Sequence, residues 1–332
     1  MAVMAGIDIG TNTLRLLVAR LDGPDKLIEL DSDCRITRLG EGLHREGRLL
    51  PSAMARTVAV LKEFGEKLSR YELNDLVVVG TSAVREAKNR AEFLGLVKEQ
   101  AGFAIEVISG MEEARRTFLG VLLGIGVTRS RMVVMDVGGG STEFIIGEHG
   151  IPRQILTTDW GVVALTEKYL TTDPISTIDF DALKAAVEIR LKPVCESLMA
   201  EKPFSLIGTA GTITTLAAID QRLERYAPNR INRYRLKKSS VAGMLEKFLS
   251  KNIKNRSLMP SLRKDRADII VAGTAILMMT MDRLECNEIL VSDYGLREGI
   301  LLDRYLQQYE TERESIKTLE EVVKNDAEKP SA

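Results

Sequence analysis

The chain has 332 residues, 45% of them hydrophobic, and a formal net charge of −1. It exceeds the size at which single hydrophobic cores usually stop growing, so we expect two domains. A nearly neutral chain has no general attraction to nucleic acid or to an anionic membrane surface, and no apolar run approaches the roughly 20 residues of a membrane span. We therefore expect neither nucleic acid nor a membrane as a partner, and any anion site must come from a local arrangement.

Cysteine and histidine are scarce. The cysteines Cys34, Cys195 and Cys286 lie far apart without the spacing of a metal site, and an odd count suits a reducing compartment. The apolar first ten residues lack the basic segment of a signal peptide, so we expect a cytoplasmic protein. The histidines His44 and His149 are distant in sequence, which argues against a histidine-rich zinc site and against a Ser-His-Asp triad.

The first part of the chain predicts three strands followed by helices that alternate with strands. The apolar runs at 3–10, 14–21 and 26–40 are strands at short spacing, typical of a meander. The pattern beyond them predicts a helix at 52–71, a strand at 75–80, a helix at 85–100, a strand at 104–109 and a helix at 110–125. This order of elements predicts an α/β layer.

The sequence then restarts, with strand patterns between residues 131 and 156. A helical pattern at 162–199 follows, and then a strand at 204–208 and more helix. The turns after the first strand of the two parts can be aligned, which pairs Asp8 with Asp136, Gly10 with Gly138, and Thr13 with Ser141. This alignment indicates a two-fold internal repeat at domain scale. Chance similarity between two tight strand-turn-strand units is the alternative.

The second of these turns holds three consecutive glycines, Gly138 to Gly140, between Asp136 and Glu143. Each glycine in an element interior costs roughly 0.5–1 kcal/mol relative to alanine, so stability does not explain them. A glycine turn lets backbone N–H groups approach a phosphate, and an acid at the strand end can hold a magnesium ion that also binds the substrate phosphates. The alternative is a plain hairpin with glycine in its turn.

Two further turns follow strands and are candidate anion sites. Thr81 and Ser82 come after the strand at 75–80, and Arg85 is expected in the first turn of the next helix, where its guanidinium can bind a phosphate. The turn at 208–212 joins a strand to a helix start, which also suits an anion. The alternatives are an exposed helix arginine and a simple strand-to-helix connection.

The helix at 110–125 begins with two adjacent glutamates. Ser109 and Glu112 have the spacing of a capping box, so Glu112 is expected to hydrogen-bond the helix start. Glu113 has no such structural duty, and a glutamate can take a proton from a water that attacks phosphorus. The alternative for Glu113 is a surface residue favoured by the helix dipole. The basic segment 222–238 either guides a polyanion or stacks a base, or is a solvated surface.

The chain resembles the exopolyphosphatase and guanosine pentaphosphate phosphatase family of the actin-like superfamily. The resemblance runs from about Ala5 to Arg304 and rests on seven motifs in the family's order, GIDIGTNTLRLLVA, GTSAVREAKN, ISGMEEAR, DVGGGSTE, GTAGT, RADII and SDYGLREGIL. It implies an α/β fold with two ribonuclease-H-like domains and an active-site cleft between them. The expected domains are 1–122, joined by a returning helix at about 299–320, and 123–298, with a disordered tail at 321–332.

The resemblance also implies an activity, which is release of terminal orthophosphate from inorganic polyphosphate or guanosine pentaphosphate, with Mg²⁺, in a cytoplasmic homodimer. Guanosine tetraphosphate is an expected ligand. By the resemblance Glu113 is the general base, and Asp136 and Glu143 surround the metal. The implied phosphate-binding residues are Asp8, Thr11, Asn12, Thr13, Arg85, Gly138, Gly139, Gly140, Ser141, Gly208, Gly211 and Thr212. A kinase of the same superfamily and a non-catalytic sensor of alarmone nucleotides are the competing interpretations.

Overall fold

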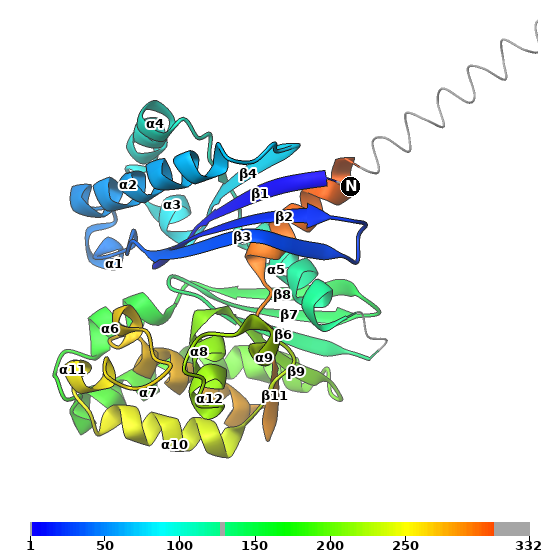
Figure 1. Ribbon diagram of the computed structural model, residues 1–332. Coiled ribbons are helices and arrows are strands. Elements are labelled where there is room, and N and C mark those ends of the chain that lie inside the picture. The colour runs from blue at the N-terminus through cyan, green and yellow to red at the C-terminus, as the bar shows by residue number, and fades with distance from the viewer. Residues whose placement is uncertain (1, 127–129, 309–332) are drawn as a thin grey trace, which may run out of the picture.

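The computed structural model describes residues 2–126 and 130–308, which form two β-sheets, each covered by helices (Figure 1). The predicted end of the returning helix at 309–320 and the predicted disordered tail at 321–332 lie outside the described residues. No helix in the described part of the chain is both long enough and apolar enough to cross a membrane.

The first sheet has the strand order β3-β2-β1-β4-β5. Its strands are β1 (Ala2–Ile9), β2 (Thr13–Leu21), β3 (Leu27–Ile36), β4 (Asp75–Gly80) and β5 (Glu106–Val107). The first three strands pair antiparallel, as the predicted meander requires, whereas β4 and β5 continue the sheet parallel to β1. The helices of this part are α1 (Leu43–Glu46), α2 (Pro51–Leu68), α3 (Ser82–Glu86), α4 (Arg90–Ala101) and α5 (Gly110–Ile125).

The second sheet has the strand order β10-β11-β9-β6-β7-β8. Its strands are β6 (Met132–Val137), β7 (Thr142–Glu148), β8 (Ile151–Thr158), β9 (Ser205–Thr209), β10 (Arg235–Lys237) and β11 (Glu288–Val291). Its helices are α6 (Val162–Tyr169), α7 (Thr177–Met199), α8 (Ala210–Asp220), α9 (Pro228–Ile231), α10 (Lys238–Leu249), α11 (Ile253–Arg256), the short 3₁₀ helix η1 (Lys264–Arg266) and α12 (Ile270–Arg283). A last helix runs from residue 296 to at least residue 308.

Apart from β10, the second sheet repeats the topology of the first. Strands β6, β7 and β8 form an antiparallel meander, and β9 and β11 extend it in parallel from β6. A meander continued by parallel strands is the ribonuclease-H-like topology. The predicted α/β fold, with two such domains and an internal repeat, is therefore confirmed. The domain limits 1–122 and 123–298 stay a prediction.

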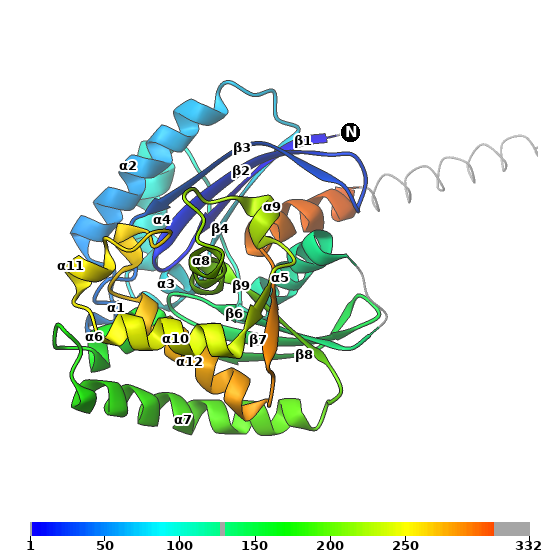
Figure 2. The ribbon, with the colours of Figure 1, turned by 60° about the horizontal axis from the view of Figure 1, so that its bottom comes forward.

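Strand β1 is apolar along most of its length because both faces of the first sheet are covered. Ile7 and Ile9 belong to a core with Leu61 and Phe64 of α2. On the other face, Met4 and Leu17 pack with Ile300 and Leu301 of the helix at 296–308. The predicted returning helix therefore begins at residue 296 rather than 299, and its described part packs on the first sheet (Figure 2). Double coverage makes a strand read as a continuous apolar run.

Two predicted helices are each interrupted. The helix predicted at 85–100 is divided between α3 and α4, because Asn89 turns inward and its amide both accepts from Leu49 N (2.8 Å) and donates to Leu49 O (3.1 Å). The helix predicted at 162–199 ends with α6 and restarts with α7. Pro174 lies in the gap, where proline cannot donate to a helical hydrogen bond. Ser176 then caps the new helix by accepting from Asp179 N (3.1 Å).

Candidate active site

The turns after β1 and β6 have the same backbone geometry. Gly10 N donates to Thr13 O at 3.0 Å, and Gly138 N donates to Ser141 O at 3.0 Å. A Cβ built on either glycine would lie 2.9 Å from that same carbonyl oxygen. The sequence alignment of these two turns is therefore matched by their hydrogen bonds, and both glycines are required by close backbone approach.

The two other glycines of the triplet let the facing turns meet across the cleft. None of the three has the positive φ that a left-handed turn would require. A Cβ on Gly139 would lie 3.1 Å from Thr11 Cβ and 3.2 Å from Asn12 N, and one on Gly140 would collide with Thr11 Oγ1 and Ser82 Oγ. The plain-hairpin alternative does not account for these contacts, because they reach across the cleft to the first domain.

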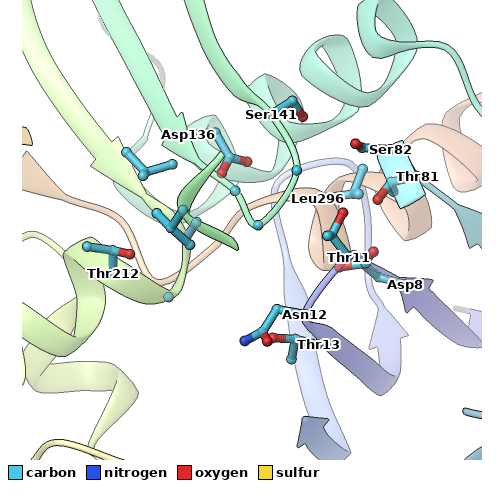
Figure 3. A pocket seen from close by; sticks show the side chains of 18 of the residues that line it. Asp8, Thr11, Asn12, Thr13, Thr81, Ser82, Asp136, Ser141, Thr212 and Leu296 are labelled. Atoms are coloured by element: carbon cyan, nitrogen blue, oxygen red, sulfur yellow. The ribbon is translucent and has the colours of Figure 1, made fainter. Parts of the chain in front are cut away.

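A cavity of about 70 Å³ lies between the two turns (Figure 3). Figure 3 shows Asp8, Thr11 and Thr13 approaching it from the first domain, and Asp136 and Ser141 from the second. Residues from both domains therefore converge on one small space. Of the residues expected from the sequence, the cavity is lined by Asp8, Thr11, Asn12, Thr13, Glu113, Asp136, Gly138, Gly139, Gly140, Ser141, Gly211 and Thr212.

Three expected residues do not line this cavity. Arg85 lies near the end of the short helix α3 rather than in the first turn of a long helix, and its Nη1 donates to Glu113 Oε2 at 3.0 Å and to Ile108 O at 2.9 Å. Glu143 is buried, with 2% exposure, and lies opposite Asp136 in the strand register. Gly208 is inside β9, where a Cβ would press against Ile289 and Ile213, so the structure gives this glycine a packing role.

The start of α5 follows the prediction in one respect and departs from it in another. Ser109 Oγ accepts from Glu112 N at 3.1 Å, as a capping serine does. The Glu112 carboxylate, however, binds Arg115 and Arg116 instead of the helix start. Half of the predicted capping box is therefore present.

The carboxylates around the cavity have raised pKa values, because they are largely removed from water and lie near other acids. Burial raises the pKa of Glu113 to about 7, although Arg85 opposes the shift, and Asp136 and Asp8 add to it. Burial also raises the pKa of Asp136 to about 6, with Arg15 opposing and Asp8 adding. The pKa of Glu143 is raised by burial, by Glu113 and by Asp136. The cluster holds more negative charge than its surroundings favour, so a bound cation would stabilise it.

Two arginines of the cleft were missed by reasoning from the sequence. Arg15 on β2 lines the cavity, with Nη1 3.7 Å from Asp8 Oδ2. Arg266 at the end of η1 is 8% exposed, has no ion pair to a described carboxylate, and places Nη2 3.5 Å from Thr13 Oγ1. A Cβ on Gly211 would collide with the Arg266 guanidinium. Both arginines lie inside quoted motifs, LRLLVA and RADII, and only the fold shows that they face the same space.

Burial lowers the pKa of Arg266 to about 10, with Arg15 adding to the shift. Arg266 therefore stays protonated at neutral pH. A buried guanidinium with no carboxylate partner is stabilised by an anion, because its desolvation is otherwise uncompensated. This side of the cavity therefore favours an anion, whereas the Asp136 side favours a cation.

A second cavity of about 600 Å³ adjoins the first and shares Arg15, Asp136 and Arg266 with it. Tyr226 of the basic segment 222–238 lines it, and its hydroxyl hydrogen-bonds Asp293. The segment is not uniformly available for an anion, because its last part forms ion pairs elsewhere: Arg235 with Glu288 and Lys238 with Asp282. The solvated-surface interpretation therefore holds for that part.

The two domains touch each other at the edge of the cleft. Arg38 Nη1 donates to Asp268 Oδ2 at 2.7 Å, and Gly42 N donates to Glu167 Oε1 at 3.2 Å. With the contact between the glycine turns, these bonds bring the two domains together around the 70 Å³ cavity.

Fold and site together define a two-domain α/β protein of ribonuclease-H-like topology, with facing glycine turns at a cleft that carries both acids and arginines. The family model for the Ppx/GppA phosphatase family matches residues 17–308, and the chain belongs to this family. The family predicted from the seven motifs is therefore confirmed.

Similar proteins cover nearly the whole chain. Exopolyphosphatase 2 of Mycobacterium tuberculosis is 32% identical over 311 residues, which are 90% of this chain and 97% of that protein. The crystal structure of the Ppx/GppA family member of Aquifex aeolicus is 31% identical with a TM-score of 0.77, and covers 92% of this chain and 98% of its own. An exopolyphosphatase structure from Cytophaga hutchinsonii is 28% identical with a TM-score of 0.84, and covers 90% and 97%.

Proposed function

We propose that the protein is an exopolyphosphatase, which releases the terminal orthophosphate of inorganic polyphosphate by attack of water. Family membership and the exopolyphosphatase relatives support this reaction class. The observation that carries the proposal is Glu113, a carboxylate that lines the cavity between the two glycine turns, is 13% exposed, and has a pKa of about 7. A general base is most effective when its pKa lies near the working pH.

In this reaction Glu113 takes the proton of the attacking water. Arg85 holds one oxygen of its carboxylate at 3.0 Å and thereby fixes the side chain. The proton acceptor must already be aligned when water and phosphorus approach, since alignment of reacting groups supplies much of the rate. A kinase would use a carboxylate in the same way but would also need a bound acceptor alcohol at this position.

The phosphate chain lies between the two turns in this proposal. Backbone N–H groups of Gly139 to Ser141, together with Thr11 and Thr13, offer hydrogen bonds to phosphate oxygens, as glycine turns do at other anion sites. Arg15 and Arg266 add positive charge to that of Arg85, the one arginine among the predicted phosphate ligands, which pairs with Glu113. Their guanidinium groups bind phosphate oxygens more directionally than a lysine would.

We propose Mg²⁺ as the cofactor, held by Asp136 with Glu143 and Asp8 nearby. The oxygens Asp8 Oδ1 and Glu143 Oε1 are buried and have no hydrogen-bond partner. A bound cation would compensate the hydration that these oxygens have lost. No group of three or more His, Cys, Asp or Glu residues within 2–126 and 130–308 is arranged to hold a metal, yet Mg²⁺ commonly uses only one or two carboxylates with water and substrate phosphates. When bound, the ion offsets the charge of the substrate phosphates.

Guanosine pentaphosphate is the second proposed substrate, and guanosine tetraphosphate the corresponding ligand. The cavity of about 600 Å³ beside the phosphate site has the size of a small-molecule pocket, and Tyr226 offers a ring in its wall. We further propose a cytoplasmic location and a homodimer.

Release of orthophosphate tests the proposal. The purified protein is incubated with polyphosphate, guanosine pentaphosphate or ATP, with Mg²⁺ or with excess chelator, and phosphate is measured over time. We expect Mg²⁺-dependent release from polyphosphate and none with chelator. Binding of guanosine tetraphosphate without turnover of any substrate would favour the sensor, and transfer from ATP to an added alcohol would favour the kinase.

A further inference from the structure

An ion network lies directly beside Glu113 on α5. The carboxylate of Glu112 accepts from Arg115 Nε (2.9 Å), Arg115 Nη2 (2.7 Å) and Arg116 Nε (2.7 Å). The same two arginines also bind Asp303 of the helix at 296–308: Arg115 Nη2 is 2.6 Å from Asp303 Oδ1, and Arg116 Nε is 3.1 Å from Asp303 Oδ2. Asp303 therefore holds two successive residues of the catalytic helix.

The pair of Asp303 with Arg116 is buried, which separates it from ordinary surface ion pairs, whereas the Arg115 side chain is 35% exposed. Asp303 is 6% exposed and Arg116 is 7% exposed. Removing one member of a buried pair leaves the other charge desolvated and uncompensated, so such a network fixes its members more firmly than an exposed pair does. Arg116 Nη2 is also bound to Glu106 of β5 at 2.9 Å. The network thus attaches the start of α5 to two elements of the first domain.

Helix α5 also packs on the second domain, so its position depends on contacts with both domains. Ala114 and Phe118 of α5 pack with Met132 and Val134 of β6 in the second sheet. Figure 2 shows α5 alongside the helix at 296–308. The backbones of the two segments are in close contact at Gly120, where an added Cβ would collide with Gly295 O. Apolar packing resists sliding only weakly compared with buried bonds of fixed direction. The network therefore decides where the first turn of α5 lies.

We infer that Asp303 is a positioning residue for Glu113. It holds Arg115 and Arg116, and through them Glu112, so that Glu113 reaches the attacking water from a fixed point relative to Arg85. This inference rests on the proposed role of Glu113 as general base. A displacement of about 1 Å by a distant change can cost about 100-fold in rate, and a partial loosening of one helix turn should cost about 10-fold.

The first test compares Asp303→Asn with Asp75→Asn. Asp75 binds the same helix, through Arg304 Nε at 2.7 Å and Gln308 Nε2 at 2.9 Å, but these bonds do not involve α5. We expect Asp303→Asn to lower kcat about 10-fold with KM changed less than about two-fold, and Asp75→Asn to leave both near wild type. Equal effects of the two variants, or an unchanged kcat in Asp303→Asn, would overturn the inference.

A double-mutant cycle with Glu113→Gln separates positioning from general structural damage. If Asp303 acts through Glu113, the 10-fold effect of Asp303→Asn should shrink to less than about two-fold once Glu113 is already glutamine. The same loss in both backgrounds would mean that Asp303 serves the fold alone. Full activity of Glu113→Gln by itself would refute the base, and with it this inference, whereas an inactive Glu113→Gln with a fully active Asp303→Asn refutes only the inference.

Glu112→Gln repeats the test from the more exposed end of the network. The Glu112 side chain is 31% exposed, so this substitution should disturb folding less than Asp303→Asn does. It replaces Asp303→Asn in the test if the thermal transition of Asp303→Asn shows that this variant is unfolded. The amide keeps the shape of the carboxylate but loses the charge that holds both arginines. We expect a loss of about three-fold in kcat with KM unchanged, and again no further loss in the Glu113→Gln background. An independent, additive loss would overturn the inference.

Discussion

The two glycine turns share one backbone geometry but differ in charge, because the first copy pairs an acid with a base and the second pairs two acids. Seven residues after the first aspartate of the repeat, the first copy has Arg15, which pairs with Asp8 in the register of β1 and β2. At the equivalent place the second copy has Glu143, which pairs with Asp136 in β6 and β7. Arg15 opposes the rise in the pKa of Asp8, whereas Asp136 adds to the rise in the pKa of Glu143. A duplicated scaffold has thus kept its hydrogen bonds and divided its electrostatic roles.

The largest expected effect is that of Glu113→Gln, which removes the proton acceptor that lies between the two copies. Glutamine keeps the size of glutamate but cannot accept a proton at neutral pH, so kcat should fall about 100-fold to 10,000-fold. Substrate binding should remain, because the turns and both arginines are unchanged. Phosphate release under saturating substrate, together with equilibrium binding of polyphosphate, measures the two quantities. An active variant would remove Glu113 from the mechanism.

The second prediction removes, one at a time, the two charges by which the copies differ, Glu143 and Arg15. Glu143→Gln should raise the Mg²⁺ concentration needed for half-maximal activity about 10-fold to 100-fold, as loss of a carboxylate near a metal does. Arg15→Gln should leave the Mg²⁺ requirement unchanged and raise KM for polyphosphate instead, because the loss falls on the anion side. Titration of activity with Mg²⁺ and with substrate distinguishes the two. If both variants changed the same constant, the division of roles would be wrong.

The third prediction concerns the part that the two turns share. Alanine at Gly10 would place a Cβ 2.9 Å from Thr13 O, and alanine at Gly138 would place one 2.9 Å from the equivalent atom, Ser141 O. Both substitutions should therefore destabilise the fold by about 1–3 kcal/mol. Urea unfolding of the two variants in parallel provides the measurement. A large difference between the unfolding free energies of the two variants would mean that the two turns are not equally constrained.

The smallest effect is a pH dependence of stability in the metal-free protein. Because the pKa of Glu113 is raised to about 7 from 4.5, the folded state holds a proton that the unfolded state has lost, and stability falls as pH rises through this window. Asp136, at about 6, acts in the same direction. Glu113→Gln should therefore gain stability relative to wild type between about pH 5 and pH 7. Thermal unfolding in chelator at both pH values tests the sign.

Sequence reasoning predicted those parts of the molecule that depend on neighbours in the chain. The meander, the glycine turns and the serine cap of α5 all arise from residues within a few positions of one another. The break before α4 could not be predicted in this way, because it depends on the bond between Asn89 and Leu49, 40 residues apart. The packing role of Gly208 likewise depends on Ile289, which reaches it only after β11 has joined the sheet.

The candidate site follows the same rule. A local motif identifies Asp136 and the glycines as candidate site residues. The position of Arg266 in the cleft, in contrast, follows from its contact with Thr13, which is 253 positions away. Charge carried by a lone arginine in a sequence says nothing about which cavity it faces. The pairing of Arg85 with Glu113 joins two helices in the same manner. Sequence reasoning gave no role to Arg266 and expected a phosphate as the partner of Arg85, because the contacts of both residues form only in the folded chain.

The small size of the cavity between the turns has a consequence for the timing of catalysis. The cavity of about 70 Å³ is narrowed where Gly140 approaches Thr11 and Ser82, so a freed orthophosphate has little path out on that side while the domains touch, and its other path leads through the adjoining cavity of about 600 Å³. Escape on the side of the turns requires the turns to part and the bond between Arg38 and Asp268 to break. In many enzymes such an opening is slower than the chemistry. We therefore expect turnover to be limited by the interval before the cleft reopens, and to rise with solvents or temperatures that hasten domain motion.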